Sequence, residues 1–551
     1  MPRLSRLAAL FLAGASVSGV NAQVVFDKVR VNEQQGSSPI FFGETAIALS
    51  RTNQNEFIAG VLCGQAPSCN IHYAIATSIN SNGTPNIVTR GVLPRPTCCP
   101  GSNGVDPFVV SAADGRMFIG GQNEDPSLGG GFYVARTPSG GATLDASLAA
   151  VCIGGFRLDK PLAAIGPISS NDPAERFFLA FSRQADVFRL TERRWNMVPG
   201  SPECSASWTE PILAINPPNL QVPDDGFPGL GGTPVILRNT VGAPQRVGRI
   251  VVASGPAGAF GQLPFVMYLN ASDTTWTPLG STIPLLLFNN GGSQSPIFPI
   301  DRTQHIPGQI RVTNHPSVAF NPANGNNLYV AFAGRPTSTT GNVDLFIAWS
   351  RDGGATFDPL DTLRLTDDHH FLPNDPQAGS DEFQPSIGVD QWGGLHILYY
   401  SSTSPDTSTV QTALFTVRYA YIQYFAGQLT QNPSVRVLSP AFSFDVDPFP
   451  NITQPGLDYQ QLSVSNCVTA VCYITTEEGT FNAYVRRIVN TACIIDYDGN
   501  GTIDSGDAFA FNENYAAGSS GADINGDGET APPDWVQYMA QWAAACAGGC
   551  P

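Results

Sequence analysis

The chain has 551 residues, and its 28 Lys and Arg against 45 Asp and Glu give a formal net charge of −17. The apolar fraction of 42% excludes an intrinsically disordered chain, which combines low hydrophobicity with high charge. The negative balance argues against nucleic acid as a partner, because binding it requires clustered Lys and Arg. Beyond the N-terminal segment, no apolar run reaches the roughly 18 residues that predict a transmembrane segment.

Residues 1–22 have the pattern of a secretory signal peptide. Arg3 and Arg6 form its positive region, the apolar stretch 7–15 is too short to cross a bilayer, and residues 20–22 end in a small-residue cleavage site. The sequence therefore predicts a secreted protein that is extracellular or attached to the cell surface. A periplasmic location is also open.

Secretion permits disulfides, and the chain contains 11 Cys. Cys63 with Cys69, and Cys467 with Cys472, are close enough in sequence to staple single hairpins, which is a hypothesis about pairing. The odd number leaves at least one thiol free or paired between chains.

A loose pattern of short strands and Gly, Pro or Asn turns recurs between about residues 40 and 490. Helical periodicity is scarce there, and prolines interrupt it. Units of four strands can bury their faces by stacking radially, so we predict an all-β fold, a six- or seven-bladed β-propeller over residues 23–490. A run of β-sandwich domains is the alternative. The clearest copies run over residues 315–357, 384–400 and 106–136, and weaker ones begin near Ala46, Pro161, Pro234 and Asp458.

One turn in this region has a recognisable pattern. Residues 350–357 read S-R-D-G-G-A-T-F, in which Asp352 can accept backbone hydrogen bonds and Gly354 can adopt a positive φ. The segment resembles the Asp-box (BNR repeat) turn of sialidase-like propellers. Residues 137–144 resemble a decayed copy with Ser139 in place of the Asp. The resemblance implies a structural turn away from any ligand pocket.

Resemblance to sialidases also implies an arginine clamp for a substrate carboxylate, a Tyr/Glu nucleophile pair and an Asp acid/base. The first clamp arginine of that family usually lies in an Arg-Ile-Pro segment, and the nearest match here is Arg95-Pro96. We therefore assign no catalytic and no cofactor-binding residue, and we expect no sialidase activity.

The most polar loop runs over residues 367–382 and contains two of the six His together with five acidic residues. Such a loop is compatible with a metal site, with a pair of catalytic carboxylates, or with a solvated connection between blades. The loop carries Asp367, Asp368, His369, His370, Asp375, Asp381 and Glu382.

The segment 491–551 contains a calcium-loop motif twice, with the copies 27 residues apart. Each copy has oxygen-bearing side chains at loop positions 1, 3, 5 and 12 and Gly at position 6, the spacing that surrounds a Ca²⁺ ion in EF-hand-like loops. We therefore predict two Ca²⁺ ions in a small α-helical module. The candidate ligands are Asp496, Asp498, Asn500, Thr502, Asp504 and Asp507 in the first copy, and Asp523, Asn525, Asp527, Glu529 and Asp534 in the second, with Thr502 and Glu529 acting through their backbone carbonyls.

A helix is expected after each loop. The first should end at Gly518 as a C-cap, and the second should begin at Pro532-Pro533. The apolar face of the second helix consists of Trp535, Tyr538, Met539 and Trp542. We expect this face to join the two halves of the module.

No amphipathic helix precedes either loop, and the pair of loop-then-helix repeats resembles a type I dockerin. Cys493 and the ending Cys546 to Cys550 are similar to the cysteine-bearing tails of secreted planctomycete proteins of this kind. The resemblance implies calcium-dependent anchoring or assembly, through a cohesin-like partner or a cell-surface partner.

Three functions fit these patterns. The main interpretation is a secreted binding protein, whose propeller recognises a glycan or another ligand and whose C-terminal module anchors it. This interpretation leans away from an enzyme. The alternative is an extracellular, sialidase-like glycoside hydrolase in polysaccharide degradation, and a third is a structural protein of the cell envelope.

Overall fold

Regular structure in this chain is almost entirely β-strand. Two α-helices occur among the described residues, α2 (Ser505–Ala516) and α3 (Pro532–Cys546). The all-β expectation is therefore correct for the described part of the chain. The computed structural model describes residues 23–32, 42–63, 70–80, 83–94, 103–124, 129–138, 140–144, 149–154, 158–169, 172–183, 195–196, 233–236, 248–254, 264–271, 276–278, 283–284, 287–290, 293–297, 316–321, 327–336, 342–354, 356–365, 380–390, 393–402, 412–422, 424–425, 428–429, 434–445, 459–465, 468–490, 505–518, 522 and 530–546.

The chain divides into two compact units. One is Phe26–Arg487, and the other combines Met1–Val25 with Ile488–Pro551. The expected signal peptide lies outside the described residues, so the predicted boundaries at residues 22 and 490 stay predictions. No helix in the described ranges combines the length and the apolar character needed to span a membrane.

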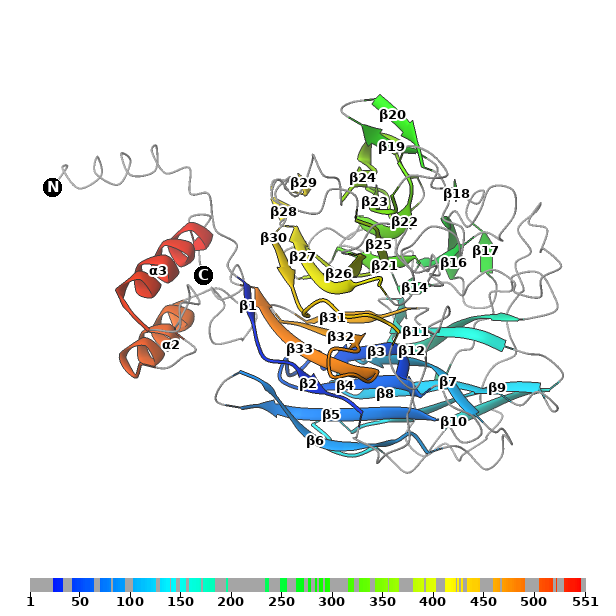
Figure 1. Cartoon of the computed structure of the whole chain (residues 1–551), viewed down its shortest axis with the longest axis horizontal. Coiled ribbons are helices and arrows are strands. Elements are labelled where there is room, and N and C mark those ends of the chain that lie inside the picture. Colours follow the sequence, from blue (N-terminus) through cyan, green and yellow to red (C-terminus); the bar gives the residue numbers. More distant parts are fainter. Residues whose placement is uncertain are drawn as a thin grey trace. The chain divides into compact units, whose positions relative to one another are not determined.

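Seven antiparallel sheets of three or more strands follow one another in the described residues. Strand order follows chain order (Figure 1), apart from the last sheet, which takes strands from the N-terminal segment, and from β18, which pairs with β16. The sheets are β3 (Phe42–Leu49), β4 (Phe57–Cys63), β5 (Ile71–Ile79), β6 (Pro85–Val92); β7 (Asn103–Ser111), β8 (Met117–Glu124), β9 (Gly129–Arg136), β10 (Ala149–Gly154); β11 (Leu158–Ser169), β12 (Asp172–Arg183), β13 (Trp195–Asn196); β14 (Thr233–Ile236), β15 (Gly248–Ser254), β16 (Pro264–Ala271), β17 (Trp276–Pro278), β18 (Ile283–Pro284); β21 (Ser317–Phe320), β22 (Leu328–Gly334), β23 (Asp344–Ser350), β24 (Leu363–Arg364); β25 (Glu382–Val389), β26 (Leu395–Ser402), β27 (Phe415–Ile422), β30 (Ser434–Val437); and β31 (Gln461–Ser465), β32 (Val468–Thr475), β33 (Asn482–Asn490), β1 (Gln23–Val25), β2 (Val29–Arg30). Two-stranded sheets are formed by β19 (Leu287–Asn290) with β20 (Ser293–Pro296) and by β28 (Tyr424–Phe425) with β29 (Gln428–Leu429).

The first strands of the seven sheets form a closed ring. Each contacts the first strand of the next sheet, in the order β3, β7, β11, β14, β21, β25 and β31, and β31 contacts β3 again. We call these seven the ring strands. A closed ring leaves no ring strand without neighbours on both sides, as radial stacking requires.

The core lies between neighbouring sheets. One apolar cluster joins the first sheet, through Ile58 and Ile75, to the second, through Ile119 and Tyr133. Strands β22 and β23 are buried along their whole length, which explains why they read as continuous apolar runs rather than as alternating ones.

Serine hydroxyls connect consecutive ring strands. Ser317 Oγ accepts a hydrogen bond from Ile387 N at 3.0 Å, and Ser386 Oγ accepts one from Leu462 N at 3.0 Å. The next sheet repeats the contact, because Ser463 Oγ accepts from Leu49 N at 3.0 Å. Two of these serines follow the prolines that begin the clearest sequence repeats, so the repeat encodes a link between sheets.

Cysteine pairing differs in part from the sequence hypothesis. Cys63 is disulfide-bonded, whereas Cys472 is a free, buried thiol, so the hypothesised bond between Cys467 and Cys472 is wrong. Cys472 lies within β32, whose side chains are buried throughout. Burial raises the pKa of its thiol to about 12, which leaves it unreactive as a thiolate.

The two helices of the C-terminal unit pack through aromatic rings. Phe511 of α2 stacks on Tyr538 of α3 with ring centroids 3.9 Å apart, and Met539 and Trp542 pack against this pair. The prediction for these three residues of α3 is confirmed.

Trp535 is a correction to the predicted apolar face. It is 40% exposed, and its indole Nε1 donates a hydrogen bond of 2.7 Å to Asn512 Oδ1. The indole lies at the margin of the stripe, where its N–H finds a partner at the helix surface. Gly518 has a φ of +64° and follows α2, as expected for a C-cap glycine.

Candidate functional site

One end of the ring gathers polar residues. Because neighbouring strands are antiparallel, each ring strand begins at the end of its sheet where the second strand finishes and the third starts. Asp381, just before β25, illustrates this: its backbone N donates a 2.9 Å hydrogen bond to Ser402 Oγ at the end of β26. We call the end where the ring strands begin the start face.

Three ring strands carry a strained bulge close to the start face. Glu44, Asp106 and Gln384 have φ values of 26°, 52° and 51°, and they are the non-glycine residues with positive φ among the described residues. At each one the strand pairing shifts register. Such backbone conformations cost about 1–3 kcal/mol each and concentrate at functional sites.

The segment before the ring strand β31 connects these bulges. Tyr459 O accepts a hydrogen bond from Thr45 N at 3.3 Å, and Tyr459 Oη donates one to Pro107 O at 2.9 Å. Gln460 Nε2 donates to Gln384 O at 3.1 Å. Tyr459 and Gln460 thus hold all three bulges: they bond to the neighbours of Glu44 and Asp106 and to Gln384 itself. We call Glu44, Asp106, Gln384 and Gln460 the bulge cluster.

The bulge cluster is buried although all its side chains are polar. The exposed fractions of Glu44, Asp106, Gln384 and Gln460 are 2%, 4%, 2% and 4%. Among the described residues, neither Nε2 nor Oε1 of Gln384 has a hydrogen-bond partner, and Gln460 Oε1 has none either. A buried amide without partners is costly, and most such groups in folded proteins are satisfied.

A pair of acidic residues lies on the same face. Glu382 is the first residue of β25, and Asp344 is the first residue of β23, the third strand of the preceding sheet. Burial raises the pKa of the Glu382 carboxyl well above its usual value, and the charge of Asp344 raises it further. Ser380 and Ser401 donate hydrogen bonds of 2.5 and 3.1 Å to Glu382 Oε1, which offset part of that increase.

Asp344 forms an ion pair with a neighbouring arginine. Arg364 donates a hydrogen bond of 2.8 Å to Asp344 Oδ2, so the ion pair holds a negative charge on this side chain. The positive charge of Arg418 lowers the pKa of Glu382 and so offsets part of its increase. Burial thus favours the neutral form of Glu382, and the ion pair favours the charged form of Asp344, as for a general acid beside a charged carboxylate.

Asp381 and Glu382 are the members of the predicted polar loop that the structure describes; its residues 367–375 lie outside the described part. Asp381 has a structural role, because its Oδ1 accepts a 2.7 Å hydrogen bond from Val343 N and ties two neighbouring sheets together. Glu382 is the residue of this loop that contributes to the site.

The Asp-box turn has the expected geometry. Asp352 accepts hydrogen bonds from Thr356 N at 2.9 Å and from Thr356 Oγ1 at 2.6 Å, and Gly354, with a φ of 90°, donates its N–H to Ser350 Oγ at 2.7 Å. The turn connects β23 to β24 and therefore lies at the end opposite the start face. Its structural assignment is confirmed.

A buried triad-like network also lies away from the start face. His396 Nδ1 is 2.5 Å from Tyr419 Oη and 2.7 Å from Thr469 Oγ1, and its Nε2 is 3.2 Å from Asp390 Oδ2. His396 and Thr469 are fully buried, and Asp390 is 1% exposed. The network joins β26 to β32 of the next sheet.

The predicted calcium ligands fall mostly outside the described residues. Those outside are Asp496, Asp498, Asn500, Thr502, Asp504, Asp523, Asn525, Asp527 and Glu529. Asp507 and Asp534 are described, and each is fully buried in the first turn of its helix. Asp534 Oδ2 accepts a 2.8 Å hydrogen bond from Ala531 N. A buried carboxylate at the end of each loop fits the donor set that Ca²⁺ prefers. No cluster of three or more metal-binding side chains occurs among the described residues.

Sequence reasoning missed most of the start-face residues. Asp344 and Arg364 gave no signal, because their partners come from other strands. Asp106 and Gln384 did give one, since each precedes a proline at the start of a predicted repeat. Proline cannot donate to the strand ladder and is therefore found at bulges.

Comparisons with known proteins give weak likenesses. No protein-family model matches the chain, and no curated protein matches it. Among solved structures, the α-L-arabinofuranosidase Arb93A from Fusarium graminearum is similar at 10% identity with a TM-score of 0.36, over 84% of this chain and 97% of that one. A Trypanosoma rangeli sialidase matches at 10% identity and a TM-score of 0.35, over 85% of this chain and 59% of that one. A polysaccharide lyase of the ulvan lyase type matches at 10% identity and a TM-score of 0.38, over 83% and 95%.

Proposed function

We propose that this chain is an extracellular glycoside hydrolase built on a seven-bladed, sialidase-like β-propeller. The observation that carries the proposal is the pair Glu382 and Asp344 on the start face. The ring of seven sheets supports the blade number. This is the alternative interpretation of the sequence, and it replaces the pure binding role as the leading one.

Each carboxyl group has a distinct role in the proposed reaction. Glu382, kept protonated by its burial, donates a proton to the glycosidic oxygen of the leaving group. Asp344, paired with Arg364, stabilises the positive charge that develops on the sugar ring. Water then adds to the anomeric carbon and gives up a proton to the Glu382 carboxylate, which restores the acid. Ser380 and Ser401 orient the Glu382 carboxyl through their hydrogen bonds.

Hydrolysis of fluorogenic aryl glycosides tests this proposal. We expect release of fluorophore from at least one neutral pyranoside or furanoside, and a fall in kcat of about 10²–10⁴-fold in Glu382→Gln. The control is Asp361→Asn, which removes a partner of Arg351 near the Asp-box turn. Absence of hydrolysis across the panel, or full activity of Glu382→Gln, would contradict the proposal.

The C-terminal module supports a second proposal, calcium-dependent anchoring of the secreted enzyme. The buried carboxylates Asp507 and Asp534 begin two helices at the spacing of the repeated loops. With two Ca²⁺ ions bound, the module would attach to a cohesin-like or cell-surface partner. The proposal leaves open a binding protein without hydrolysis, which the aryl glycoside panel distinguishes.

A further inference from the structure

We propose that the bulge cluster is a binding subsite for an uncharged, hydroxyl-rich sugar unit. The inference rests on the proposed function, because it names the substrate class of the same face. It concerns residues that the proposed proton transfer does not use, namely Glu44, Asp106, Gln384 and Gln460.

Backbone strain recurs at equivalent positions of three ring strands. The positive-φ residues Glu44, Asp106 and Gln384 each lie at a register shift in a ring strand, near its beginning. The same costly conformation thus recurs in three separate sheets. Bulges redirect side chains, and here they do so at one end of the ring.

Two buried amide side chains, those of Gln384 and Gln460, also point to a ligand. Gln384 is 2% exposed, and among the described residues both polar atoms of its side chain lack a partner. Gln460 already donates to Gln384 O, yet its Oε1 also lacks a partner in the described ranges. A ligand that donates and accepts hydrogen bonds would satisfy these atoms.

The chemistry of the four side chains selects the ligand. An amide offers a donor and an acceptor side by side, and a hydroxyl group complements both. A cation could donate to Gln384 Oε1 but would leave its Nε2 donors unpaired. Glu44 and Asp106 also bring two acidic side chains to the cluster, which disfavours an anionic sugar there. A neutral sugar is therefore favoured over an amino sugar or a sialic acid.

The test uses Gln384→Met in the full chain. Methionine keeps the length of the side chain but removes the amide, so the free protein should melt at the same temperature or higher, because no internal hydrogen bond is lost. Binding of arabinose, galactose or glucose, measured by calorimetry, should weaken at least about tenfold, the loss expected for a well-placed hydrogen bond. The control is Gln461→Met, one residue beyond the cluster on β31.

Three results would overturn the inference. They are a lower melting temperature of Gln384→Met with unchanged sugar binding, tighter binding of glucosamine or N-acetylneuraminate than of every neutral sugar, or no sugar binding at all. Binding is measured in the Glu382→Gln background, so that turnover does not interfere. Retained sugar binding without hydrolysis by the unmodified chain would contradict the proposed function and leave this inference intact.

Discussion

Glu382 shows how a single side chain can link stability to pH. Its carboxyl is buried, and its pKa in the folded chain is raised well above the ordinary value of 4.5. Below that ordinary value both the folded and the unfolded chain hold the proton, and the stability contribution is complete. As the pH rises further, the unfolded chain releases the proton before the folded chain does, so the folded state binds more protons and stability falls.

Glu382→Gln should therefore gain stability relative to the unmodified chain as the pH increases. The glutamine stays neutral, so the difference should grow from about pH 4.5 until the folded pKa is passed. Denaturant midpoints measured at successive pH values between 4 and 8 check this. A difference that stays constant over the range would show that the Glu382 carboxyl ionises normally in the fold. Asp361→Asn serves again as the control.

At the residue scale, the sequence predicts the roles of residues whose partners are close in the chain. It does not predict which side chains from separate sheets lie near one another. Asp352 was assigned correctly, because its partner Thr356 is four residues away and the turn is defined by its own sequence. The charges of Asp344 and Glu382 interact only because β23 and β25 belong to neighbouring sheets. A single sequence contains no signal for that proximity.

Elements of the ring follow from short-range patterning. The strands were predictable because apolar and β-branched runs lie between Gly, Pro and Asn turns. The sheet containing β14 comes from one of the regions where the repeat is weak, near Pro234, and the sequence predicts six or seven blades. The seventh sheet takes strands β1 and β2 from the N-terminal segment, and no repeat pattern indicates this.

Calcium binding beside the two helices α2 and α3 can be tested directly. The full chain should bind two Ca²⁺ ions, and Asp507→Asn or Asp534→Asn should each lose one, because each removes the charged ligand at position 12 of its loop. Removing calcium with a chelator should loosen the contact between Phe511 and Tyr538, since carboxylates gathered without a cation repel one another.

Calorimetric titration of calcium measures the number of ions, and near-ultraviolet circular dichroism follows the aromatic contact. Glu513→Gln, which removes an exposed acidic side chain of α2, is the matched control and should keep both ions. The loops fail as calcium sites if the unmodified chain binds none, or if neither Asp variant loses an ion.

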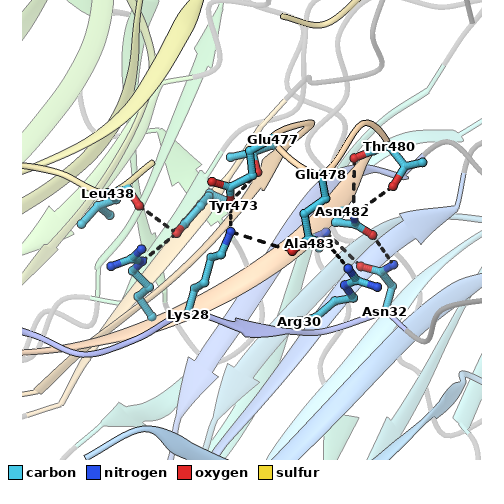
Figure 2. Close-up of polar contacts among 12 residues, drawn as sticks. Lys28, Arg30, Asn32, Leu438, Tyr473, Glu477, Glu478, Thr480, Asn482 and Ala483 are labelled. Atoms are coloured by element: carbon cyan, nitrogen blue, oxygen red, sulfur yellow. Dashed lines mark hydrogen bonds and ion pairs between the residues drawn. The ribbon is translucent and has the colours of Figure 1, made fainter. Parts of the chain in front are cut away.

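At the scale of the molecule, the ring is closed by residues from opposite ends of the unit Phe26–Arg487. β2 pairs with β33, and Val31 N donates to Ala483 O at 2.9 Å. Figure 2 shows the side chains that secure this closure: Lys28 pairs with Glu477, Arg30 pairs with Glu478, and Asn32 meets Asn482.

These closing contacts differ in burial, which decides their strength. Glu478 is 41% exposed, and exposed ion pairs contribute about 0–1 kcal/mol. Asn32 is 3% exposed; its Nδ2 donates to Asn482 Oδ1 at 3.0 Å, and its Oδ1 accepts from Ala483 N at 2.9 Å. Removing it leaves a buried N–H without a partner, which costs about 1–3 kcal/mol.

Asn32→Ala should therefore destabilise the whole ring more than Arg30→Ala, although the asparagine carries no charge. The loss should appear as one cooperative shift of the unfolding transition, because β33 belongs to the last sheet and β31 of that sheet contacts the first. Adding about 1 M salt should remove the small effect of Arg30→Ala by screening, and it should leave that of Asn32→Ala unchanged. Denaturant unfolding of both variants at low and high salt measures these effects. If Arg30→Ala is the more damaging variant, charge rather than buried hydrogen bonding closes the ring.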